Sequence, residues 1–194
     1  MVVLDEYTRE CTALEVGRKF TSDHFVEVLA ELISVRGVPK FIRSDNGPEL
    51  ISRRIREFLA AIEVDTSYIE LGSPWQNGYM ESFNSRFRDA FLALEVFDNL
   101  QAAKILTGQW RKNYNEARPH SSSGFAPPSE FARQCSVAVA GAPSTEHCRN
   151  NTTNFNQPVL SQPPGTKNGG TSVASGIPIP FKRLITLFSV LSRN

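Results

Sequence analysis

Apolar and polar side chains in the first part of the chain follow two different periods. Short runs rich in apolar and β-branched residues at positions 2–4, 11–16 and 64–69 are typical of strands. The pair Phe41-Ile42 predicts a further short, buried strand. Apolar residues that recur every three or four positions predict helices around residues 25–33 and 55–62.

The first of these helices has recognisable ends. Thr21, Ser22 and Asp23 are residue types that favour a helix start. Gly37 followed by Pro39 favours a helix end, because glycine accepts the left-handed conformation and proline cannot continue the helix. The helix is therefore expected to lie between residues 21 and 37.

Two later helices complete the pattern. One is expected from about residue 77 to 94, after a loop rich in Gly, Ser and Pro. The last is expected to begin near Asp98, whose spacing to Gln101 resembles a capping box, and to end near Tyr114. The order strand, strand, helix, strand, helix, strand, helix predicts an α/β fold with a mixed sheet.

The composition changes near residue 135. Residues 136–180 contain three charged side chains and many Ser, Thr, Asn, Gln, Pro and Gly residues. Such a segment has too little apolar surface to offset the entropy lost on ordering, so a disordered C-terminal tail is expected. The predicted organisation is a folded part at 1–134 and a low-complexity tail at 135–194.

The net charge of +1 neither favours nor excludes a nucleic-acid partner. Basic residues nevertheless concentrate between positions 50 and 120, where they are able to form a phosphate-binding surface. A solvated helix face explains any single one of them equally well. The basic residues of this region include Arg53, Arg54, Arg56, Arg86, Arg88, Arg111, Lys112 and Arg118.

Three cysteines, an odd and small number, are expected to be reduced thiols, not a disulfide framework. No signal peptide is recognisable at the N-terminus. The apolar run at 181–191 contains Lys182 and Arg183 and is shorter than the about 20 residues that span a bilayer. These features predict a cytoplasmic protein without a membrane segment.

Asp45 follows the predicted strand at Phe41-Ile42 and precedes Asn46-Gly47. A carboxylate at the carboxyl end of a strand, in a sharp turn, points into the crevice where α/β folds bind ligands. The alternative is an ordinary Asp-Asn-Gly turn.

Glu81 is expected in the first turn of the helix that Asn77-Gly78 opens. Ser85 and Arg88 follow it at helical spacing, so the three side chains share one face. A carboxylate that holds a cation, with an arginine that holds a DNA strand, suits a phosphate substrate. The alternative is a glutamate that only stabilises the helix N-terminus.

Two carboxylates brought together repel each other unless a divalent cation lies between them. Mg²⁺ prefers oxygen ligands, and a two-metal site activates the attacking oxygen and stabilises the leaving oxygen of a phosphodiester reaction. A site of this kind normally needs a third carboxylate. Asp45 and Glu81 are therefore candidate metal ligands and catalytic residues.

Four segments together resemble the integrase catalytic core of bacterial insertion-sequence transposases of the OrfB type, the branch that is similar to retroviral integrases. The resemblance covers about residues 1–134, and its specificity comes from the joint occurrence of the segments. They are Asp5 to Cys11, Arg43 to Glu49, Ser73 to Asn84 and Tyr114 to His120.

The resemblance implies a ribonuclease H-like fold, a mixed sheet flanked by helices, with an Asp, Asp-35-Glu triad that uses Mg²⁺ or Mn²⁺. Asp45 matches the second acid and Glu81 the third, with 35 residues between them. Arg88 matches the basic residue that follows the glutamate. Asn77 and Gly78 match the loop before the catalytic helix. Arg118, Pro119 and His120 match a closing motif with a structural or DNA-contacting role.

The chain also departs from the family pattern. The first catalytic Asp of the family lies on a strand that would precede Met1, and Asp5 does not align with it. The family's N-terminal helix-turn-helix region has no counterpart either. The expectation is therefore a sheet whose first strand is missing, in a truncated copy of the core.

Three functions follow from these features. The first is metal-dependent DNA cleavage and strand transfer in DNA transposition, with double-stranded DNA at element ends and target as substrate and a homo-oligomer when the full-length protein assembles. The second is a catalytically inactive remnant that only binds DNA or transposase subunits. The third, a general nuclease, is disfavoured because the segments around Gly78 and Arg118 are transposase-like. DNA contacts are expected from Asn77, Gly78, Ser85, Arg88, Arg118 and His120, and whether the chain is itself an enzyme depends on the missing first acid.

Overall fold

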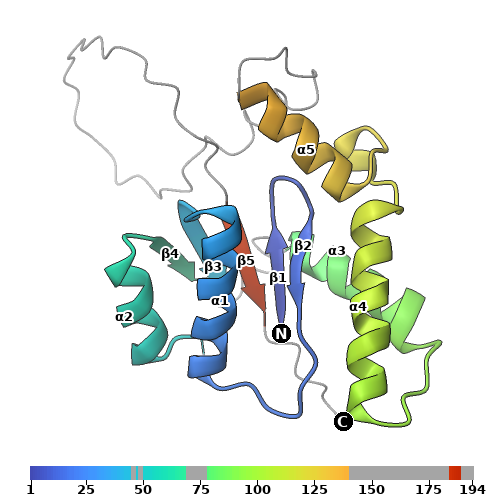
Figure 1. Ribbon diagram of the computed structural model, residues 1–194, viewed down its shortest axis with the longest axis horizontal. Coiled ribbons are helices and arrows are strands. Elements are labelled where there is room, and N and C mark those ends of the chain that lie inside the picture. The colour runs from blue at the N-terminus through green and yellow to red at the C-terminus, as the bar shows by residue number, and fades with distance from the viewer. Residues whose placement is uncertain (45–46, 48–49, 69–77, 140–183, 189–194) are drawn as a thin grey trace, which may run out of the picture. The chain divides into compact units, whose positions relative to one another are not determined.

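Five strands form one mixed sheet in the order β2-β1-β5-β3-β4 (Figure 1). The computed structural model describes residues 1–44, 47, 50–68, 78–139 and 184–188. The predicted α/β class with a mixed sheet is confirmed. The strands are β1 (Val2–Asp5), β2 (Cys11–Leu14), β3 (Phe41–Ser44), β4 (Asp65–Tyr68) and β5 (Leu184–Phe188).

The two halves of the sheet differ in direction. β1 and β2 form an antiparallel hairpin with an irregularity between Val3 and Leu4. β3 and β4 are parallel, with Phe41 opposite Asp65. β5 joins the halves, because it pairs antiparallel with β1 and parallel with β3.

The position of β5 differs from expectation. Leu184–Phe188 comes from the segment expected to be a low-complexity tail, yet it pairs on both sides in the middle of the sheet. Its sequence, Leu-Ile-Thr-Leu-Phe, contains no acidic residue. The sheet was expected to lack a strand, and the described sheet instead has β5 between β1 and β3.

Successive residues of β1 point to opposite faces of the sheet, which separates two apolar cores. Val3 packs in one core with Phe25 and Leu29 of α1 (Ser22–Arg36) and with Ile55 of α2 (Arg53–Ala61). Val2 and Leu4 belong to the other core. That core includes Met80, Phe83 and Phe87 of α3 (Gly78–Phe87), Phe91 of η2 (Arg88–Leu92) and Tyr114 of α4 (Leu100–Glu116). The helices thus cover the sheet on both faces.

The helix boundaries agree in part with the sequence signals. Helix α1 (Ser22–Arg36) has Thr21 as its N-cap and Gly37, at a φ of 81°, as its C-cap, as predicted. The N-cap of α4 is Asn99, whose side chain accepts a hydrogen bond from the Ala102 backbone N–H, so the expected capping box at Asp98 is wrong. The other helical segments are α2 (Arg53–Ala61), α3 (Gly78–Phe87), the π-helical η2 (Arg88–Leu92), α4 (Leu100–Glu116), the 3-10 turn η3 (Ser121–Ser123) and α5 (Pro128–Val139).

The chain divides into two compact units. Residues 1–132 with 182–194 form the first, which contains the whole sheet, and residues 133–181 form the second. In the second unit Cys135 is disulfide-bonded, which corrects the expectation of reduced thiols, whereas Cys11 of the first unit is free and buried. None of the described helices is long and apolar enough to cross a membrane.

Candidate active site

Glu81 lies in the first turn of α3, as the sequence predicts. Its side chain is exposed, and among the residues that the structure describes it has no ion-pair partner. The helix N-terminus favours its negative charge. An exposed, unpaired carboxylate at this position fits the oxygen chemistry of a divalent cation.

Ser85 and Arg88 follow Glu81 along the exposed side of the helix. The Ser85 hydroxyl donates a hydrogen bond to Asp89 Oδ2 at 3.1 Å, so it is already engaged within the helix. Arg88 is the first residue of the π-helical segment η2 and is exposed. The contact of Arg88 with DNA stays a prediction.

The other acid of the predicted pair follows strand β3 in the sequence. Asp45 comes directly after Ser44, the last residue of β3, and it lies outside the described residues, as does Asn77. Gly78 opens α3, and a Cβ there would meet no heavy atom within 4 Å. Within the described ranges no group of three or more His, Cys, Asp or Glu side chains is arranged to hold a metal. The pairing of Asp45 with Glu81 stays a prediction.

The strand that leads to Asp45 is fixed by an ion pair between a buried glutamate and a partly exposed arginine. Arg43 Nη1 of β3 lies 3.0 Å from both carboxylate oxygens of Glu6, in the turn between β1 and β2. Asp5 braces the same turn, because its Oδ1 accepts hydrogen bonds from the backbone N–H groups of Tyr7 and Thr8 at 2.9 and 3.1 Å. Asp5 thus has a structural role in this turn.

His120 is buried, whereas a residue that contacts DNA from the protein surface is exposed. Its ring lies edge-on to Tyr114, with centroids 4.8 Å apart, and its Nδ1 is 3.4 Å from Arg86 Nη1. Burial, followed by the charges of Arg86, Arg118 and Arg9, lowers the pKa of His120 to about 4. The imidazole is therefore neutral at pH 7, while Arg118 beside it in sequence is partly exposed.

Sequence reasoning did not single out Arg9, and it named Arg86 only among the basic residues between positions 50 and 120, although the structure places both beside His120. The three residues line one cavity of about 190 Å³. Arg9 has a positive φ of 64°, unusual for a non-glycine residue. The sequence did mark the segment that contains Arg9, because Asp5 to Cys11 carries part of the family resemblance. The spacing of residues in that segment did not indicate a binding role for the Arg9 side chain.

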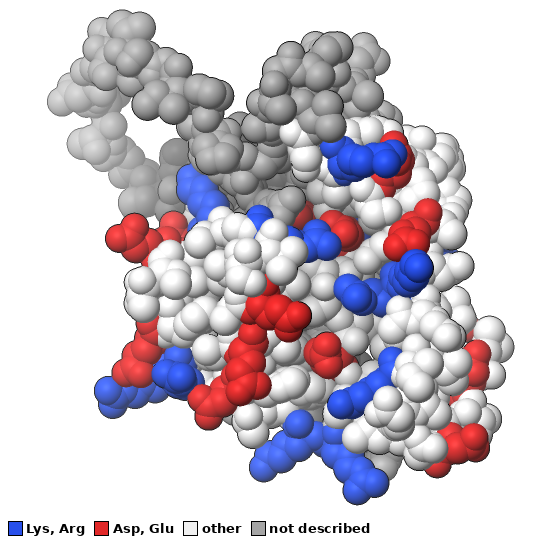
Figure 2. Space-filling model, viewed as in Figure 1, with Lys and Arg blue, Asp and Glu red and all other residues white. Residues whose placement is uncertain are grey.

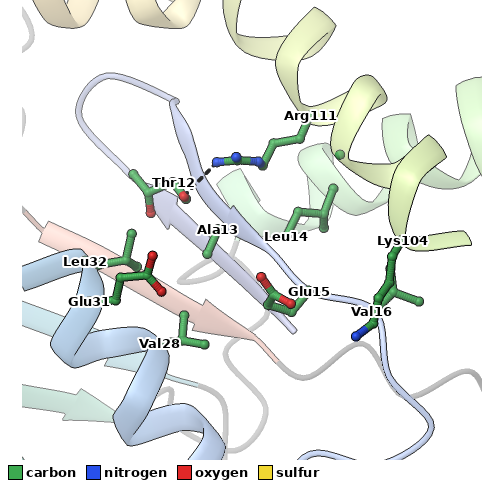
Figure 3. Close-up of a pocket in the computed structure, with 11 residues that line it drawn as sticks. Thr12, Ala13, Leu14, Glu15, Val16, Val28, Glu31, Leu32, Lys104 and Arg111 are labelled. Carbon is green, nitrogen blue, oxygen red and sulfur yellow. Dashed lines mark hydrogen bonds between the residues drawn. The ribbon is translucent and has the colours of Figure 1, made fainter. Parts of the chain in front are cut away.

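A larger cavity of about 300 Å³ lies between α1, β2 and α4, away from the candidate site (Figure 3). Arg111 closes part of it by donating a hydrogen bond to the Thr12 carbonyl at 2.9 Å. Glu15, Glu31 and Lys104 also line it, so its charge is mixed. On the face shown in Figure 2, acidic and basic side chains are likewise interspersed.

Two family models match the chain. Both are described as integrase core domain, one over residues 1–74 and the other over residues 62–128. Together they span the sheet strands β1 to β4, the helices α1 to α4 and the Arg118–His120 segment.

Proteins of bacterial insertion elements are similar in sequence. The 39.2 kDa protein of insertion element IS476 from Xanthomonas euvesicatoria is 39% identical over 132 residues, which cover 68% of this chain and 38% of that protein. The 31.7 kDa protein of IS407 from Burkholderia multivorans is 38% identical over 144 residues, covering 74% of this chain and 52% of that protein. The transposase InsD of Escherichia coli is 34% identical over 92 residues, covering 47% of this chain and 30% of that protein. The chain thus spans about half or less of the length of these relatives.

Solved structures confirm the fold. The catalytic core domain of BIV integrase superposes with a TM-score of 0.56 at 16% identity, covering 72% of this chain and 88% of that one. The HTLV-2 integrase catalytic core, determined in complex with magnesium, gives a TM-score of 0.51 at 18% identity, covering 66% of this chain and 81% of that one. The fold is therefore that of the ribonuclease H-like integrase cores. The chain belongs to the integrase core domain family, among the proteins of bacterial insertion elements.

Proposed function

We propose that this chain is the core of a transposase that cleaves and joins DNA during transposition of an insertion element. The observation that carries the proposal is the position of Glu81, a carboxylate in the first turn of α3 that is exposed and has no ion-pair partner among the described residues. The 35-residue interval to Asp45, which directly follows β3, supports it. The similarity to insertion-element proteins gives the reaction class.

In this proposal Asp45 and Glu81 would hold a divalent cation, Mg²⁺ or Mn²⁺. Such a cation, when bound, activates the attacking oxygen and stabilises the leaving oxygen in an in-line displacement at phosphorus. Arg88, which is exposed at the start of η2 directly after α3, would orient the strand through its phosphates, with Arg118 as a further contact. Double-stranded DNA at element ends and target is the substrate, and the complete protein acts as a homo-oligomer.

A second candidate function is DNA or subunit binding without catalysis. One observation favours it: β5, the strand beside β3 on the side of β1, carries no carboxylate that would add a third acid to Asp45 and Glu81. Two carboxylates hold a cation more weakly than three, so cleavage would fall before DNA binding does.

A nicking assay distinguishes the two functions. The purified chain is incubated with supercoiled plasmid and Mn²⁺, and open-circular product is quantified for wild type, Asp45→Asn and Glu81→Gln. The control is Glu95→Gln, which removes an exposed carboxylate beyond η2. Transposase chemistry predicts nicking by wild type and Glu95→Gln only.

DNA affinity is measured in parallel by fluorescence anisotropy. Binding without nicking in every variant supports the non-catalytic function. Nicking by Glu81→Gln at the wild-type rate would contradict the catalytic proposal.

A further inference from the structure

A cavity of about 190 Å³ lies against a different face of α3 from the one that carries Glu81. Tyr79, Ser82 and Arg86 recur at helical spacing and line it from α3. Glu81 and Ser85 project from another side of the same helix, and Arg88 follows at the start of η2. The cavity is thus separate from the proposed metal-binding face.

The charge of the cavity is one-sided. Arg9 and Arg86 line it, and neither forms an ion pair within the part of the chain that the structure describes. Arg9 instead stacks over the Tyr79 ring, 3.4 Å from its centroid, and donates a hydrogen bond to the Glu6 carbonyl. None of the described lining residues is acidic, so the cavity has a positive potential.

His120 adds an unsatisfied donor to these charges. An arginine only donates hydrogen bonds, so His120 Nδ1 is the acceptor of its contact with Arg86. The neutral imidazole then carries its proton on Nε2. That atom is buried and has no hydrogen-bond partner among the described residues, in a side chain that is 4% exposed. A buried N–H without an acceptor is unfavourable, so an oxygen ligand is favoured at this place.

The arginine and serine side chains that line the cavity restrict the chemical class of ligand that fits it. Two guanidinium groups that have no ion-pair partner among the described residues repel a metal cation, and they are poor neighbours for an apolar molecule. Exposed hydroxyls at Ser82, Ser121 and Ser122 add further hydrogen-bonding capacity at the mouth. Two arginines together with hydroxyl groups supply hydrogen-bond donors that suit the oxygen atoms of an oxyanion, either planar or tetrahedral.

We propose that this cavity binds a phosphate group between Arg9, Arg86 and the Nε2–H of His120. The phosphate comes either from free inorganic phosphate or from a DNA backbone, and the recognition chemistry is the same. With DNA as the source, the proposal rests on the proposed function and adds a second anchoring point on α3, away from the cleavage site.

The first test needs no variant. Inorganic phosphate is titrated into the full chain at constant ionic strength, and the His120 ring is followed by long-range proton–nitrogen NMR. The expected result is a saturable shift of the His120 Nε2 resonance with retention of the Nε2–H tautomer, together with a higher Tm. Absence of both changes, or the same changes with chloride, would overturn the proposal.

The second test compares an arginine that lines the cavity with an exposed arginine on another helix. Arg86→Met is expected to weaken phosphate binding about tenfold or more, because a charge-assisted hydrogen-bond donor is lost. Arg86→Lys keeps the charge and should lose less. Arg53→Met, on α2, should leave phosphate affinity unchanged, because this exposed arginine pairs with Glu57 and does not line the cavity. Equal affinity in Arg86→Met and wild type, with both folded by circular dichroism, contradicts the assignment.

A DNA-binding measurement distinguishes the two sources of the phosphate. It also keeps the test of the phosphate site separate from the test of the catalytic proposal. If DNA supplies the phosphate, inorganic phosphate competes with DNA and Arg86→Met weakens DNA binding. If free phosphate is the ligand, DNA affinity does not respond to Arg86→Met. Failure of the nicking assay with a positive phosphate titration would refute the catalytic proposal alone.

Discussion

Arg43 Nη1 lies 3.0 Å from both carboxylate oxygens of Glu6, and the Glu6 side chain is only 3% exposed. This pair joins the β1–β2 turn to β3, two residues before Asp45. The alignment of the strand end that presents the predicted acid therefore depends on a contact made 37 residues away in sequence.

The pair predicts a stability effect. Arg43→Met leaves a buried carboxylate without its cation, so it should lower the free energy of unfolding by about 2 kcal/mol or more. Urea denaturation followed by circular dichroism measures the change. Arg53→Met is the control, because the Arg53–Glu57 pair is largely exposed and such pairs contribute little. Equal effects of the two substitutions would contradict a structural role for Arg43.

The central position of β5 in the sheet predicts that a proline in this strand destabilises the fold. Thr186→Pro removes a backbone N–H from a strand that is paired on both sides, and it should cost about 3 kcal/mol or more. Thr186→Val keeps the N–H and is the matched control. Hydrogen exchange of residues 2–5 and 41–44 should accelerate in the proline variant only. Unchanged exchange there would mean that β5 does not complete the sheet.

The lowered pKa of His120 predicts a pH dependence. The unfolded chain binds a proton near pH 6.5, whereas the folded chain binds one only near pH 4, so the unfolded state takes up more protons in this window. Stability therefore falls as the pH drops from 6.5 to 4, by up to about 3 kcal/mol from this group. Arg86, Arg118 and Arg9 face the ring and stay charged throughout.

His120→Gln should flatten this part of the stability profile, measured by urea denaturation at a series of pH values. A wild-type slope in His120→Gln would contradict the assignment.

Metal binding at Glu81 predicts a ligand-dependent Tm. Mn²⁺ should raise the Tm of wild type and of Glu95→Gln, because a ligand that binds only the folded state stabilises it. Glu81→Gln should lose this increase, while its Tm in EDTA stays close to that of wild type. An undiminished Mn²⁺ response in Glu81→Gln would exclude this carboxylate as a ligand.

DNA binding should depend steeply on salt, because phosphate contacts release counterions. Arg88→Met should reduce the slope of log K against log salt concentration by about one unit. Arg53→Met, which removes an arginine already paired with Glu57, should leave the slope unchanged. Fluorescence anisotropy at several salt concentrations measures it. A salt-insensitive affinity would argue against a phosphate-binding surface.

Local signals in the sequence predicted much of the fold. The caps at Thr21 and Gly37 were correct because they act within one helical turn. The position of Glu81 at the start of α3 was correct for the same reason. Asn99 displaced Asp98 as the cap of α4, since both residue types cap helices and only the backbone geometry decides between them.

Non-local features were not predictable in this way. The π-helical segment at Arg88–Leu92 interrupts a helix that the periodicity alone presents as continuous. The cavity of Arg9, Arg86 and His120 joins three segments that are far apart in sequence. The pairing of β5 with β1 and β3 joins strands that are more than 140 residues apart in sequence. The polar, low-complexity segment before β5 gave no indication that a strand follows it.

The place of β5 in the sheet has a consequence for how the protein is made. A ribosome delivers Leu184–Phe188 only after every other described element has emerged, so β1 and β3 leave the ribosome before their shared neighbour exists. Pairing across such a long sequence separation is slow, and open strand edges bind other chains in the meantime. Cellular chaperones, and the speed of translation through residues 140–183, would then decide how much of each newly synthesised chain reaches the folded state.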